Sequence, residues 1–167
     1  RDLPLKYDAK SGNLGIEVSG GQELFRVTPY DKILFVRKSG IFSVCETPKK
    51  LFVGPQLRHC GFADKESLSK VLFTILYRDP ETQFVYIKRC KIQAFIMNRD
   101  YFFAPDVMEV LHVDTRKNFA FQLNYVKKPR VKVLSEKFKA ENYEEKSLKA
   151  KGVRVVAKEV QDIVVQE

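Results

Sequence analysis

The residue types that most often carry catalysis or bind metals are few in this sequence, and their spacing suits neither task. The two histidines are His59 and His112, and the three cysteines, Cys45, Cys60 and Cys90, contain no Cys-x-x-Cys pair. Because neighbouring residues of a strand point to opposite faces, His59 and Cys60 are not placed to act as a catalytic dyad. The sequence therefore predicts no catalytic residue, no metal site and no cofactor.

The short motifs also argue against an enzyme. Gly20 and Gly21 lie between two short predicted strands and not before a helix, so a hairpin turn is favoured over a phosphate cradle. No GxxxxGK[ST], GxSxG, HExxH or EF-hand pattern occurs. The cysteines adjoin apolar segments, where a free thiol behaves as a small hydrophobe, so we expect unpaired thiols in a reduced, cytosolic protein. An enzyme with an unrecognised site is the least supported alternative.

Lysine and arginine are the side chains that could bind a ligand. The 167 residues contain 30 Lys and Arg against 21 Asp and Glu, a net charge of +9. No apolar run approaches the roughly 18 residues of a membrane helix, and no signal peptide is apparent, so we expect no membrane partner. A basic surplus without membrane features favours a polyanion, most often nucleic acid. The alternative is a propeller-like scaffold that binds another protein and whose charge serves solubility.

The predicted DNA-contacting cations lie in or just beyond the turns between apolar runs. They are Arg37, Lys38, Arg78, Lys88, Arg89, Lys91, Lys127, Lys128, Arg130 and Lys132. A single charged turn is usually just solvated. If basic turns recur at equivalent points of a repeat, they would instead form a row of regularly spaced phosphate contacts. Such a row would give an affinity for DNA that depends on salt.

The elements that must position these cations are repeated β-hairpins. Residues 33–36 form an apolar run that is followed by a basic turn with a glycine and by a second run at 41–44, the pattern of a hairpin. Comparable units begin at residues 71 and 119, a spacing of about 40–50 residues that indicates a propeller or related array of small β-blades. We expect residues 33–36, 71–75 and 119–123 to be equivalent buried strands.

The last third of the chain gives a weaker pattern. Residues 135–151 have few apolar side chains and many opposite charges, which predicts a long connector with one helical turn. Residues 153–157 and 163–165 are predicted strands that close the array against the N-terminal segment.

The length fits one domain over residues 1–167. We expect approximate blades at 6–44, 45–90, 91–134 and 135–167. The absence of an initiator Met suggests a fragment of a longer chain.

Residues 28–54 resemble a blade of the C-terminal domain found in the A subunits of DNA gyrase and topoisomerase IV. Such blades have an Asp-x-Ile-Leu-(Phe/Leu)-Val strand, present here at residues 31–36, then a basic turn with glycine and a second strand. Residues 6–18 resemble the glycine-containing strand pair before such a hairpin, and 147–160 resemble its version in the last blade. The similarity spans nearly the whole chain, strongest over 6–54 and weakest over 135–150.

The resemblance implies an all-β fold, the β-pinwheel, a propeller-like disc of three to four blades that exchange strands. It also implies a non-catalytic, DNA-binding and DNA-bending domain whose partners are double-stranded DNA, the rest of the A subunit and the B subunit, in a cytoplasmic, nucleoid-associated bacterial enzyme. The Gly/Arg/Lys-rich Gln box of gyrase is missing, since residues 19–23 only echo it and Glu23 has the wrong charge, which favours a topoisomerase IV-like role. The strand-cleaving tyrosine of the family belongs to a core outside this sequence.

Overall fold

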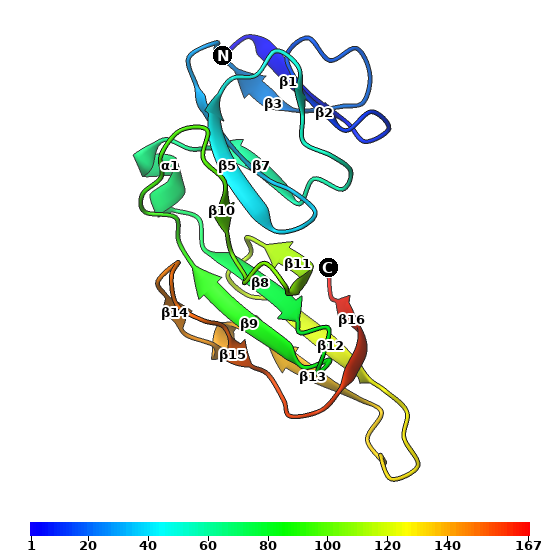
Figure 1. Ribbon diagram of the computed structural model, residues 1–167. Coiled ribbons are helices and arrows are strands. Elements are labelled where there is room, and N and C mark those ends of the chain that lie inside the picture. The colour runs from blue at the N-terminus through cyan, green and yellow to red at the C-terminus, as the bar shows by residue number, and fades with distance from the viewer. The chain divides into compact units, whose positions relative to one another are not determined.

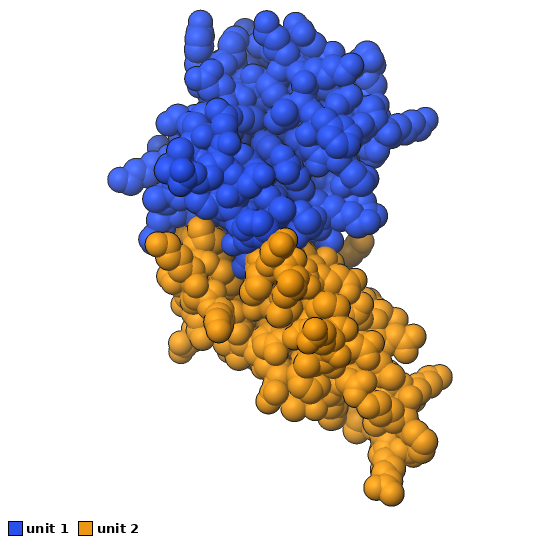
Figure 2. Space-filling model, viewed as in Figure 1, with its two compact units in different colours: residues 1–70, 92–103 blue, residues 71–91, 104–167 orange.

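The computed structural model describes all residues, 1–167, and shows a nearly all-β chain with 16 strands, one short α-helix and one 3-10 helix (Figure 1). The strands form four sheets, which confirms the prediction of an all-β, pinwheel-like fold. The chain divides into two compact units, residues 1–70 with 92–103 and residues 71–91 with 104–167 (Figure 2). No helix has the length and apolar character needed to span a bilayer.

Unit 1 contains two four-stranded sheets. The first has the order β3 (Gln22–Val27), β1 (Leu3–Asp8), β2 (Asn13–Gly15) and β6 (Leu51–Phe52). The second has the order β10 (Tyr101–Phe102), β5 (Ile41–Glu46), β4 (Lys32–Val36) and β7 (His59–Phe62). The single α-helix, α1 (Lys65–Ser69), follows β7, and the Asp64 carboxylate caps its first turn by accepting the Ser67 N–H at 3.0 Å.

Unit 2 contains the other two sheets. The third has the order β11 (Glu109–Asp114), β8 (Phe73–Arg78), β9 (Val85–Cys90) and β14 (Glu145–Lys146), and β15 (Val153–Arg154) also pairs with β9. The fourth has the order β13 (Ser135–Lys139), β12 (Ala120–Tyr125) and β16 (Val160–Val165). The 3-10 helix η1 (Ala140–Asn142) follows β13.

The four sheets share one connectivity. Each is built on a hairpin, β1–β2, β4–β5, β8–β9 or β12–β13, and the first strand of each hairpin also pairs with a later antiparallel strand, β3, β7, β11 or β16. In the first three sheets the second hairpin strand pairs with a segment from beyond the next hairpin, β6, β10 or β14. This exchange of strands between successive sheets is the pinwheel feature that the resemblance implied. It makes β4, β8 and β12 equivalent, as predicted.

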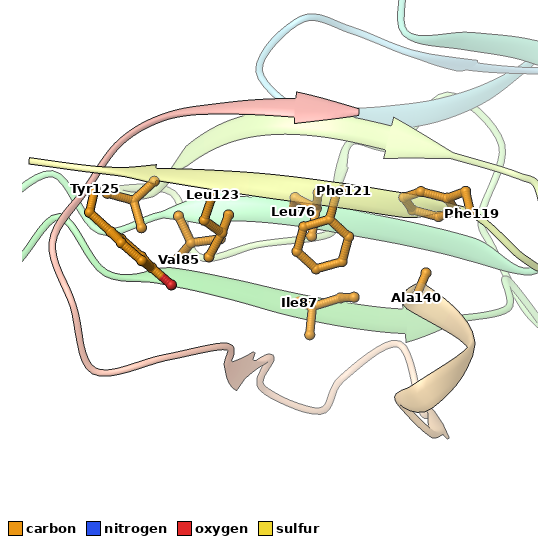
Figure 3. Packing of buried hydrophobic residues seen from close by; sticks show 9 residues of the cluster. Leu76, Val85, Ile87, Phe119, Phe121, Leu123, Tyr125 and Ala140 are labelled. Atoms are coloured by element: carbon orange, nitrogen blue, oxygen red, sulfur yellow. The ribbon is translucent and has the colours of Figure 1, made fainter. Parts of the chain in front are cut away.

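Each unit has its own core. In unit 1 the core joins the two sheets, with fully buried Leu5 and Leu14 from the first and Ile33 from the second. In unit 2, Phe121 and Leu123 of β12 pack with Leu76 of β8 and with residues of β9 (Figure 3). Ile33, Phe121 and Leu123 come from the apolar runs that the sequence identified as strands, whereas Leu5 lies outside them. Within a strand, alternate residues share one face, which places them together in a core.

Several boundaries differ from those expected. The second strand of the third hairpin is β13, so the connection of this hairpin runs from residue 126 to residue 134 and is longer than the other hairpin turns. The first hairpin strands of the four sheets begin at Leu3, Lys32, Phe73 and Ala120.

The chain after residue 134 differs most from the sequence prediction. Residues 135–151 were expected to be a connector, yet they contain β13, η1 and β14. β15 pairs with β9 and β16 pairs with β12, so neither predicted closing strand pairs with the N-terminal segment. The side chains of β13 alternate between exposed and half-buried and are mostly charged. A strand of this kind lacks the apolar pattern by which strands are recognised in a sequence.

Candidate nucleic-acid interface

The turn between β4 and β5 presents one lysine to solvent. It is closed by the Gly40 N–H, which donates to the Arg37 carbonyl at 2.9 Å, and Gly40 has a φ of +83° that favours glycine. Lys38 is exposed. The Arg37 guanidinium lies 3.7 Å from the Asp100 carboxylate and over the Phe35 ring. Part of the charge of Arg37 is therefore compensated, and Lys38 is the better placed of the two for a phosphate.

Arg78 has a structural position at the end of β8. Its guanidinium contacts the Glu109 carboxylate at 2.7 Å and donates to the carbonyls of Val160 and Gln161 at 3.0 and 2.6 Å. It therefore ties β8 to β11 and β16. The connection itself, residues 79–84, contains two acidic residues and no lysine or arginine. The sequence suggested a basic connection in every repeat, but the connection of this hairpin is acidic.

Lys88 and Arg89 are buried, each 6% exposed, although we predicted that they would extend the DNA-contacting track. Arg89 donates to the Thr74 hydroxyl at 2.9 Å and to the carbonyls of Tyr143 and Lys117. The Lys88 ammonium donates to a backbone carbonyl of the segment between β14 and β15, and burial lowers the pKa of both side chains. Because segments next to β14 and β15 supply the Tyr143 and Leu148 carbonyls and both cations are buried, we leave both out of the proposed surface.

The connection between β12 and β13 is the most basic exposed segment. Lys127, Lys128, Arg130 and Lys132 are all exposed, whereas Lys91 of the same prediction is half-buried in a separate segment. Lys128 forms an ion pair with Glu159. The other three loop cations have no carboxylate within ion-pair distance.

A hollow of about 520 Å³ lies beside this loop in unit 2. Its lining combines four cations and one carboxylate with two aromatic rings: Lys128, Arg130, Lys132, Lys158, Glu159, Phe84 and Tyr125. The Tyr125 hydroxyl and the Lys158 ammonium both donate to the Glu136 carboxylate, at 2.7 and 3.0 Å, and these two bonds hold the pKa of Glu136 below its usual value. The neighbourhood remains net positive, which suits an anionic ligand.

A second lysine-bearing turn was missed as a candidate site by the sequence reasoning. Lys10, Ser11 and Gly12 connect β1 to β2 just as Lys38, Ser39 and Gly40 connect β4 to β5. In both turns the serine Oγ accepts the N–H two residues later at 3.4 Å, and both glycines have positive φ. Lys10 is exposed like Lys38. The repeated Lys-Ser-Gly tripeptide was a readable signal of this equivalence.

The thiols and histidines do not assemble an obvious reaction centre. Burial raises the pKa of Cys45 and Cys90 to about 11 and that of Cys60 to about 12, so all three are protonated near neutral pH and are poor nucleophiles. Cys60 and His59 line a hollow of about 880 Å³ in unit 1, and burial lowers the pKa of this histidine. No cluster of three or more His, Cys, Asp or Glu side chains could hold a metal ion.

The remaining histidine stabilises a strand end. His112 Nε2 lies 2.7 Å from a carboxylate oxygen of Asp114, and the guanidinium of Arg116 donates to the same carboxylate at 2.8 Å. Although burial alone would raise the pKa of Asp114, these hydrogen bonds hold it well below its ordinary value. Asp114 and Arg116 therefore form an ion pair at the end of β11, beside the His112 ring.

Hairpin sheets that exchange strands in series, with cations at several exposed turns, define a pinwheel-type β-array. The chain belongs to the family described as the topoisomerase C-terminal domain of Bacteroidota, whose family model matches residues 4–167. This confirms the resemblance to a topoisomerase C-terminal domain. Neither a curated protein nor a solved structure matches the chain.

Proposed function

We propose that this domain is the non-catalytic, duplex-DNA-binding part of a bacterial type IIA topoisomerase A subunit. In a topoisomerase IV-like role it would bind and bend DNA segments and guide them to the cleavage core. Its partners would be double-stranded DNA, the rest of the A subunit and the B subunit, in the cytoplasm and on the nucleoid. The observation that carries the proposal is the set of exposed cations in the loop between β12 and β13.

The exposed cations of the loop between β12 and β13 favour duplex DNA, and not another protein, as the partner. A duplex carries closely spaced phosphates, and each phosphate that a Lys or Arg neutralises adds roughly 0.9 to the slope of log affinity against log salt. If Lys127, Arg130 and Lys132 each contact a phosphate, they contribute a slope of about 2.7, which corresponds to roughly fortyfold in affinity between 50 and 200 mM salt. A solubility-only role for these charges predicts no such dependence.

The test compares two charge-reversal variants of equal net charge. The loop variant carries Lys127→Glu, Arg130→Glu and Lys132→Glu, and the control carries Lys146→Glu, Lys149→Glu and Lys151→Glu, at exposed lysines of unit 2 outside this loop. Binding to fluorescent duplexes of several sequences is measured by anisotropy at several salt concentrations.

We expect the loop variant to bind every duplex more weakly, with a salt slope shallower by roughly 2–3. The control should lose less, since both variants change the long-range field equally. If the parent binds duplex DNA but the loop variant matches it, the loop is not the interface. If the parent does not bind duplex DNA at all, the scaffold alternative is the better account.

A further inference from the structure

Two phenylalanines of unit 1 lie at equivalent exposed positions. Phe52 of β6 is 67% exposed and Phe102 of β10 is 48% exposed. Both β6 and β10 are the strands that add to the second strand of a preceding hairpin. Phe52 pairs with Asn13, the residue after Gly12, and Phe102 pairs with Ile41, the residue after Gly40. Each ring is therefore placed next to a Lys-Ser-Gly turn.

The structure holds the Phe52 ring, and the strand that carries Phe102, in defined places. A Cβ added at Gly12 would lie 2.8 Å from a ring atom of Phe52, so this ring packs directly on the turn. The Val53 and Gly54 N–H groups donate to the Gly12 carbonyl at 2.8 and 3.1 Å and fix the strand beneath it. In the second sheet the next residue, Phe103, is buried with its ring 4.6 Å from that of Phe42, which anchors the strand that carries Phe102.

The charge around the two rings favours DNA. Lys10 and Lys38 are exposed in the adjoining turns, and Lys49 and Lys50 are exposed immediately before β6. The Asp8 carboxylate at the base of the first turn is occupied within the turn, accepting the Ser11 hydroxyl at 2.9 Å and the Lys10 N–H at 3.2 Å. An isolated exposed ring needs no explanation. A phenylalanine paired with the residue that follows a Lys-Ser-Gly turn, found in two sheets, is harder to attribute to chance.

We propose that Phe52 and Phe102 are a pair of apolar contacts to duplex DNA, lying against the sugars and base edges of the minor groove while Lys10 and Lys38 bind the flanking phosphates. Apolar side chains of DNA-bending proteins act in this way by opening a base step and stabilising the bend. The inference rests on the proposed function. The two phenylalanine contacts would add a component of DNA affinity that does not depend on salt, in contrast to the phosphate contacts.

The test separates the two kinds of contact in the same binding assay. The double variant Phe52→Ala/Phe102→Ala should bind duplex DNA about tenfold more weakly at each salt concentration, with the slope of the parent. The variant Lys10→Ala/Lys38→Ala should instead lower the slope by about 1.8. Tyr30→Ala is the control, since Tyr30 is 87% exposed in unit 1 but belongs to a different turn. It should bind as the parent does.

If the double alanine variant does not fold, Phe52→Leu/Phe102→Leu replaces it. Leucine keeps an apolar side chain over each turn, and a smaller loss, roughly threefold, is then expected with the slope unchanged. If a folded variant that lacks Phe52 and Phe102 binds duplex DNA with the affinity of the parent, this inference is overturned and the proposed function is left intact. Failure of the parent to bind duplex DNA overturns both.

Discussion

At the scale of single residues, Arg89 shows a cation used for stability. Its guanidinium links β8, the turn before β12 and the segment before β14 through hydrogen bonds to Thr74, Lys117 and Tyr143. Two of the three acceptors are backbone carbonyls at the ends of elements. Such carbonyls are costly to bury without a donor.

We therefore predict that Arg89→Met destabilises the domain by roughly 1–3 kcal/mol, because the buried Thr74 hydroxyl and two partly buried carbonyls lose their charged donor. The free energy of unfolding in urea measures this. Lys132→Met, at an exposed loop position, should leave the stability nearly unchanged and reduce DNA affinity instead. The account of Arg89 is wrong if its variant is as stable as the parent and binds DNA less tightly.

Whether a basic residue is exposed or buried is difficult to predict from this sequence, and Arg89 illustrates the reason. β9 contains two adjacent basic residues, which by composition belong to a surface. Two of the carbonyls that these cations bind, those of Tyr143 and Leu148, lie 54 and 60 residues later along the chain, in a segment rich in charged residues. Only the pairing of distant segments reveals the burial. The loop at 127–132 was predictable because nothing folds over it.

At the scale of elements, the first exchanged segment depends on one glycine. Gly15 at the end of β2 faces the backbone that leads into β6, where Ile16 N–H donates to the Pro48 carbonyl at 3.0 Å and Glu17 N–H to that of Lys49 at 2.9 Å. A Cβ on Gly15 would lie only 2.0 Å from the Lys49 carbonyl oxygen. The exchange thus requires close approach of two backbones, a common reason for glycine in a strand.

Gly15→Ala is expected to displace the segment before β6 and to destabilise the domain by about 1–3 kcal/mol, the usual range for overpacking. Gly20→Ala is the matched control, because its added Cβ would meet only the Asp8 carboxylate, at 3.6 Å. Thermal unfolding compares the two. Equal melting temperatures for both variants and the parent would contradict the role given to the exchanged segment.

The hairpins β4–β5 and β8–β9 were predictable from sequence, whereas β13, β14 and β15 were not. β4–β5 and β8–β9 have apolar runs on both sides of a turn, so period and turn chemistry agree. β14 and β15 have two residues each, and all four of those side chains are exposed. Their pairing is decided by backbone hydrogen bonds to a partner strand far away in sequence. No local pattern encodes that choice.

At the scale of the whole molecule, only some of the positive charges are available to bind a ligand. The chain carries a net +9, yet Lys88 and Arg89 are buried and Arg78 is held by a carboxylate and two carbonyls. The exposed cations that carry the proposed function lie in the loop from Lys127 to Lys132, and those of the further inference lie in the turns at Lys10 and Lys38. Family membership and this distribution together support the proposal that the domain binds DNA.

The salt dependence of duplex binding by the parent chain tests this central claim most directly. Fluorescence anisotropy with a duplex of random sequence, titrated at several salt concentrations between 50 and 200 mM, gives the slope of log affinity against log salt. We expect binding at 50 mM with a linear slope of about −3 to −5, equivalent to three to six phosphate contacts. No binding at 50 mM, or an affinity that does not change with salt, would contradict the account.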